Sequence, residues 1–216
     1  METLATPHLR INKILLNIVG QWPHQPKVAK TICYCLMLFF TSTQAYLQIA
    51  GMICARNNID LFLESIPTVL VDFTCAAKIF NFFYNGDKMK QLLLILEDDW
   101  RNVKTYSEAA ILNKYSLFAR KLTLMYCGAL YGTMTPFLLI PLVPIIHNFI
   151  ATQNDSISKQ LMFEQVDYLL DTEKYYYPLF IHGYCGTLAF LTVVVAIDTM
   201  FMVYVEHACA IFAVVG

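Results

Sequence analysis

Charged residues are scarce in this sequence of 216 residues, and their scarcity indicates its broad class. Asp, Glu, Lys and Arg make up 14% of the chain, hydrophobic residues make up 57%, and the mean hydropathy is +0.52. Such a composition is typical of a protein embedded in lipid. The formal net charge of −1 provides no excess of positive charge for nucleic acid. We therefore predict an all-α membrane protein whose solvent is the lipid bilayer, with no nucleic-acid partner.

The sequence also lacks the cysteine and histidine patterns of disulfide-rich, metal-binding and catalytic proteins. All seven cysteines lie within or at the ends of apolar runs, which is not the pattern of a secreted disulfide framework. His147 and His182 flank one loop, without the His-x-x-x-His or Glu-x-x-His spacing of metal ligands. We expect no metal site, no cofactor and no enzymatic activity.

Four apolar stretches are each long enough to cross a bilayer, which takes roughly 20 helical residues. Charges and prolines interrupt the segment before the first stretch, so we expect no cleaved signal peptide. The last apolar run continues from Pro178 to Gly216, and as one helix it would be much longer than a hydrocarbon core is thick. The predicted transmembrane helices are residues 28–54, 61–84, 122–146 and 179–205.

Lys and Arg are distributed unequally between the two sides of these spans. The chain up to Lys30 and the segment 85–121 together hold eleven of the fifteen, whereas segments 55–60 and 147–178 hold three. Loops that stay in the cytoplasm carry the excess of Lys and Arg. We therefore predict a multi-pass protein of the plasma membrane, with residues 1–27 and 85–121 cytoplasmic and residues 55–60 and 147–178 extracellular.

The segment 147–178 carries two further marks of an extracellular loop. It holds five acidic residues against two lysines. It also contains Asn154-Asp155-Ser156, an acceptor sequon for N-glycosylation, which is modified only on the lumenal or extracellular side. We predict glycosylation at Asn154.

Four patches of sequence, taken in order, resemble one family. They are Gly20-Gln21-Trp22-Pro23 before the first span, residues 95–100 (ILEDDW) before the third, residues 171–182 (DTEKYYYPLFIH) at the entry to the fourth, and residues 205–212 (VEHACAIF) at its end. In this order, and with this topology, the chain resembles the insect odorant receptors. The gustatory receptors of the same superfamily are the nearest alternative. A tetraspanin-like protein would need paired cysteines in its outer loop, and these are absent.

The resemblance implies a role in olfaction. Family members have seven spans with the amino terminus inside, and they act as odour-gated cation channels in a heteromer with a shared odorant receptor co-receptor. The chain matches about the first half of such a receptor and has no counterpart of the pore-lining last span. We therefore expect an odorant receptor subunit in truncated form, and a non-functional truncated product is the alternative.

The resemblance also implies a binding site for a small apolar odorant, in the outer half of the spans. The same side chains would equally suit ordinary helix packing. By depth, the implied residues are Val69, Asp72 and Phe73 on the second span, Tyr131, Met134, Thr135 and Leu138 on the third, and Tyr184, Thr187, Leu188 and Leu191 on the fourth.

Two opposite charges within the spans are expected to meet. Lys78 and Asp198 lie at similar depths, roughly 27 and 30 Å from the outer ends of their helices at 1.5 Å per residue. We predict an intramembrane ion pair between them, the alternative being that each reaches the headgroups separately. Asp72 is about 240° around the helix from Lys78 and is therefore expected to face the cavity.

The predicted topology can be tested by glycosylation mapping. We expect the full chain, expressed with an acceptor sequon in an amino-terminal tag, to be modified at Asn154 and not at the tag, because the loop 147–178 reaches the lumen whereas the amino terminus stays in the cytoplasm. Glycosidase-sensitive mobility on a gel measures both, and Asn154→Gln is the control. Modification at the tag with none at Asn154 would reverse the topology.

Overall fold

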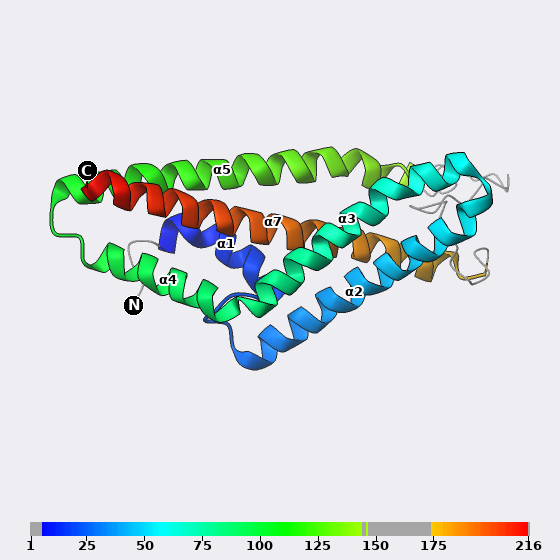
Figure 1. Cartoon of the computed structure of the whole chain (residues 1–216), viewed down its shortest axis with the longest axis horizontal. Coiled ribbons are helices and arrows are strands. Elements are labelled where there is room, and N and C mark those ends of the chain that lie inside the picture. The colour runs from blue at the N-terminus through cyan, green and yellow to red at the C-terminus, as the bar shows by residue number, and fades with distance from the viewer. Residues whose placement is uncertain (1–5, 144–145, 147–173, 216) are drawn as a thin grey trace. The chain divides into compact units, whose positions relative to one another are not determined.

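The computed structural model describes residues 6–143, 146 and 174–215, and these form helices with no strand among them. Figure 1 shows the helices in chain order. They are α1 (Thr6–Val19), α2 (Lys27–Cys54), the short 3₁₀ turn η1 (Ala55–Asn57), α3 (Ile59–Tyr84), α4 (Gly86–Arg101), α5 (Tyr106–Leu139) and α7 (Tyr176–Val215).

Four of the described helices, α2, α3, α5 and α7, are long and apolar enough to cross a membrane. They contain 28, 26, 34 and 40 residues. A helix satisfies its backbone hydrogen bonds internally, which is what a chain surrounded by lipid requires. The predicted all-α class, with four helices of membrane length, is confirmed for the described residues.

Two of the helices extend beyond the predicted spans. α5 begins at Tyr106 instead of residue 122, because Leu112, Ser116 and Ala119 continue a helical face with no breaker before the apolar run. It ends at Leu139, shortly before Pro141, since the residue preceding a proline disfavours helical backbone. α7 continues from Tyr176 to Val215 as one helix.

The chain divides into two compact units. Unit 1 comprises Met1–Cys35, Lys78–Leu130 and Thr192–Gly216, and unit 2 comprises Leu36–Ala77 and Tyr131–Leu191. Each of the four long helices therefore contributes one stretch to each unit.

In unit 1 the core forms where α1 and α4 bury their apolar faces. On α4, Leu93, Leu96 and Trp100 recur at three and four residues and are all buried. The ring of His8 on α1 stacks on Trp100, with 6.1 Å between ring centroids. Burial, and secondarily the charge of Arg120, lowers the pKa of His8 below its usual 6.5, so this ring is neutral at pH 7.

The interior of unit 2 is more polar. Its buried side chains include Gln44, Gln48, Ser65, Asp72 and Thr187 beside apolar residues such as Val69 and Leu179. A Cβ atom at Gly186 on α7 would lie 2.6 Å from Oε1 of Gln44 on α2, so the two helices approach closely there. Thr43 on α2 and Nε2 of His182 on α7 also form a hydrogen bond of 2.8 Å.

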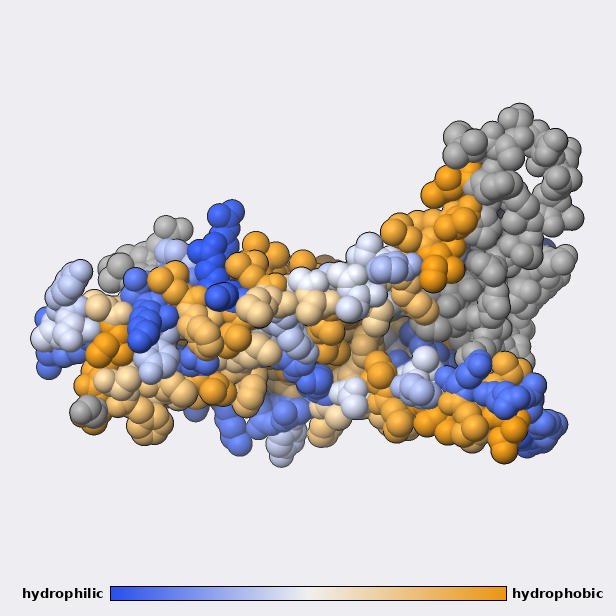
Figure 2. Space-filling view, turned by 90° about the horizontal axis from the view of Figure 1, so that it is seen from above, coloured by the Kyte–Doolittle hydropathy of each residue, from blue (hydrophilic) through white to orange (hydrophobic). Residues whose placement is uncertain are grey.

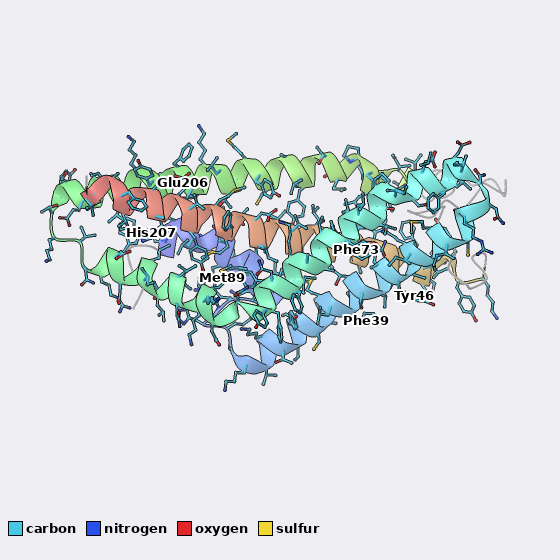
Figure 3. All side chains as sticks on the ribbon, viewed as in Figure 1. Phe39, Tyr46, Phe73, Met89, Glu206 and His207 are labelled. Carbon is cyan, nitrogen blue, oxygen red and sulfur yellow. The ribbon has the colours of Figure 1, made fainter. Side chains whose placement is uncertain are left out.

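Large apolar side chains point outward from the long helices. Phe39 and Tyr46 on α2 and Phe73 on α3 are all exposed, and Figure 3 labels them. Figure 2 shows broad hydrophobic areas on the face that it presents. Apolar residues on the outside suit helices whose solvent is lipid, where burial in protein brings no hydrophobic gain.

A left-handed glycine ends α1. Gly20 has φ +72°, its N–H donates to the Asn17 carbonyl at 3.1 Å, and the N–H of Gln21 donates to the Leu16 carbonyl at 2.8 Å. This pair of bonds is the Schellman motif, which satisfies carbonyls that the helix end leaves open. A Cβ atom at Gly20 would lie 2.5 Å from the Lys30 carbonyl oxygen and 2.6 Å from the Tyr34 nitrogen. The glycine of the Gly-x-Trp-Pro patch therefore permits both the turn and the packing of α1 against α2.

We expect Gly20→Ala to lower the free energy of unfolding by at least about 1–3 kcal/mol, the cost of a strained backbone conformation alone. The backbone overlap would add to this loss. Gly86→Ala is the matched control, because nothing lies within 4 Å of a Cβ atom at Gly86. Unfolding in mixed micelles measures both, and equal stability of the two variants would contradict the role of Gly20.

Candidate ligand-binding site

A cavity of about 420 Å³ lies within unit 2, between α2, α3, α5 and α7. This volume falls in the range of pockets that hold small organic molecules. Each helix presents residues three or four positions apart, the spacing that places side chains on one face. The lining residues are Gln44 and Gln48 on α2, Pro67, Thr68, Val71 and Asp72 on α3, Thr133, Met134 and Phe137 on α5, and Thr187 and Phe190 on α7.

The walls of this cavity are mainly apolar. Met134, Phe137 and Phe190 contribute a thioether and two aromatic rings, and Val71 adds a branched aliphatic side chain. Methionine and aromatic side chains adapt to apolar ligands of different shapes. The cavity therefore suits a small molecule with an apolar body.

Two polar groups of the cavity, on Asp72 and Gln48, lack protein partners. Asp72 is 9% exposed and Gln48 is 8% exposed, so both are buried. Oδ2 of Asp72 and Oε1 of Gln48 accept no hydrogen bond from any described residue. A buried polar group without a partner costs about 1–3 kcal/mol, and a charged one costs more. These two groups are therefore available to a ligand.

Three of the predicted ligand-binding residues line this cavity, namely Asp72, Met134 and Thr187. Val69 and Leu191 are buried but do not line it. Tyr131, Leu138 and Tyr184 are half-buried outside the lining. Phe73, Thr135 and Leu188 are exposed.

The structure therefore does not bring these eight residues to the cavity, and helix rotation explains why. Phe73 follows Asp72 directly, so its side chain is turned by about 100° and points outward, 61% exposed. Depth alone, which selected the residues, does not distinguish one face of a helix from another.

Sequence reasoning missed the contribution of α2. Gln44 and Gln48 are four residues apart in an otherwise apolar run, which places both amides on one face. Amides within a membrane span are expected to face protein, because lipid offers them no hydrogen bond. That spacing would have indicated a polar interior face of α2. The predicted glycosylation site at Asn154 lies outside the described residues.

A larger hollow of about 990 Å³ lies in unit 1, along α4 and α5. Its lining includes Tyr106, which is 92% exposed, together with Lys114 and Lys121. Charged residues lie along this groove, whereas the cavity of unit 2 has apolar walls and two buried polar atoms without a protein partner. We therefore take the smaller cavity as the candidate site.

A three-helix polar network lies in unit 1. Nζ of Lys78 on α3 pairs with Oδ1 of Asp198 on α7, and the Tyr126 hydroxyl on α5 donates to Oδ2 of Asp198 at 2.7 Å. The side chains of Lys78 and Asp198 are 34% and 23% exposed. The sequence predicted the pairing of the two charges from their depth. It did not indicate Tyr126, because nothing in the sequence distinguishes this residue from Tyr131 in the same apolar run.

In the described part of the chain, no group of three or more His, Cys, Asp or Glu side chains could hold a metal ion. His207 on α7, which Figure 3 labels, has its Nε2 2.9 Å from Oδ2 of Asp99 on α4.

We expect the Lys78 and Asp198 substitutions to be non-additive. In the cycle of Lys78→Ala, Asp198→Ala and the double variant, the coupling energy should be about 0.5–3 kcal/mol, since each single change leaves the other charge unpaired. Tyr126→Phe should cost about 1.5–3 kcal/mol, because it removes a hydrogen bond to a charged group. Unfolding in mixed micelles measures each value, with the exposed Tyr106→Phe as control. Strict additivity of the two alanine variants would show that the charges do not interact.

Comparisons with known protein families, with curated proteins and with solved structures find no match.

Proposed function

We propose that this chain is an odorant receptor subunit that binds small apolar molecules in the cavity of unit 2. The observation that carries the proposal is an apolar cavity of about 420 Å³ formed by all four membrane-length helices of the described chain. The resemblance of the four sequence patches to insect odorant receptors supports the choice of ligand class. It also supports a role in an odour-gated cation channel formed with a co-receptor.

Binding fits the cavity better than catalysis. Among the residues that line it, Asp72 is the only one with an ionisable side chain. General acid–base and nucleophilic catalysis need a second group within hydrogen-bond reach. The chemistry of the walls is that of recognition, with apolar contact for the body of a ligand and few polar groups to orient it.

The cavity also offers a way to couple binding to a change of conformation. A ligand in contact with four helices favours whichever arrangement of those helices it fits best, and it shifts the equilibrium by its difference in affinity between the arrangements. In the proposed protein the helices cross the plasma membrane and the amino terminus is cytoplasmic. The distribution of Lys and Arg supports this orientation.

We expect Met134→Trp to weaken binding of hexan-1-ol by about tenfold or more, equivalent to about 1.4 kcal/mol. The larger side chain fills the space that the ligand needs. Met125→Trp makes the same change on the same helix at an exposed position outside the lining, and it should bind like the wild type. Calorimetry with the full chain in lipid nanodiscs, corrected with empty discs, measures the dissociation constants. No binding to the wild type, or equal binding to both variants, would contradict the proposed site.

A further inference from the structure

The carboxylate of Asp72 stands in the cavity wall without a counter-charge. No hydrogen bond or ion pair joins it to any described residue, and it is buried. An isolated carboxylate away from water is among the most costly groups to bury, and within a membrane span the cost persists. The site is therefore incomplete as the protein alone presents it.

The cations of the neighbouring sequence do not supply the missing charge. The lysine of α3, Lys78, is engaged with Asp198 and is absent from the cavity lining. His182 on α7 is hydrogen-bonded to Thr43 and is also absent from the lining. The remaining lining residues carry no ionisable group, so no described side chain of the lining supplies the counter-charge.

The walls decide what kind of cation fits. A hard metal ion prefers about six oxygen ligands, whereas Met134, Phe137 and Phe190 offer a thioether and two rings. The same walls favour a hydrocarbon body, and aromatic faces also attract organic cations. The amide oxygen of Gln48, which has no donor, adds a second acceptor for a group with more than one N–H.

We propose that the cavity of unit 2 selects small apolar amines in their protonated form, with Asp72 as the counter-charge and Gln48 as a second acceptor. The inference depends on the proposed function, since it presumes that the cavity holds a ligand. It goes further because it names the functional group that this ligand carries.

The proposal predicts an order of affinity among molecules of one size. A protonated amine forms charge-assisted hydrogen bonds, which are about twice as strong as neutral ones. An alcohol of the same length fills the same apolar space and donates one neutral hydrogen bond. An ether donates none and leaves the carboxylate unpaired, so the expected order is amine, alcohol and then ether.

The test compares hexylamine, hexan-1-ol and hexyl methyl ether by calorimetry, with the full chain in nanodiscs of neutral lipid and with empty discs as the blank. We expect the wild type to bind hexylamine at least about tenfold more tightly than hexan-1-ol. Asp72→Asn should weaken hexylamine binding by at least about 30-fold, the lower end of the loss when one partner of a buried charge pair is removed. Its affinity for hexan-1-ol should change by less than about threefold, which is under 1 kcal/mol.

Asp60→Asn is the matched control. It makes the same chemical change on the same helix, at an exposed position that does not line the cavity, and it should keep the wild-type preference for the amine. Asp72→Asn exchanges an unpaired buried charge for a neutral group of the same shape, so folding should tolerate it. The comparison of ligands on the wild type needs no variant and remains decisive if Asp72→Asn fails to fold.

The outcomes separate the two proposals. Equal affinity of the wild type for hexylamine and hexan-1-ol, or hexylamine binding that Asp72→Asn leaves unchanged, would overturn the amine proposal and leave the cavity as a ligand site. Absence of binding by all three probes would overturn the proposed function, and with it this inference.

Discussion

The structure depends on one constraint, which is that lipid offers no hydrogen bond to a polar group. A helix satisfies this constraint for the backbone, because its N–H and C=O groups bond to one another, and the four long helices of the described chain follow from it. Each polar side chain needs a hydrogen-bond partner of its own. In unit 1, Asp198 has partners for both of its carboxylate oxygens, Lys78 and Tyr126. In unit 2, Oδ2 of Asp72 and Oε1 of Gln48 have none, and this difference distinguishes a structural polar cluster from a candidate binding site.

The sequence predicted the class and the number of long helices well, because apolar runs of sufficient length report directly on burial in lipid. It predicted helix ends less well. The start of α5 at Tyr106 depends on the packing of Leu112 and Ala119, which hydropathy does not register as part of a span. The pairing of Lys78 and Asp198 was predictable because a charge within a membrane span is costly unless an opposite charge lies at a similar depth.

The binding cavity was only partly predictable, and the reason is geometric. Position along a span gives depth, but the rotation of each helix decides which neighbour reaches the cavity. Asp72 lines it while Phe73 points away. Polar residues indicate which face of a helix is turned toward protein, since they avoid lipid. Apolar residues such as Leu188 and Leu138 give no such indication, because they are equally stable against lipid or protein. On α2, the spacing of the amides of Gln44 and Gln48 indicates which face is turned toward the cavity.

The shared carboxylate of Asp198 also determines the rotational register of α7 within unit 1. Apolar helix surfaces slide past one another at little cost, because one methyl contact replaces another. A carboxylate held from two sides, by an ammonium on α3 and a phenol on α5, has no equivalent position one residue further along the helix. A turn of about 100° would break both contacts at once. Among helices whose contacts are mainly apolar, this single side chain fixes the rotation of α7 about its own axis.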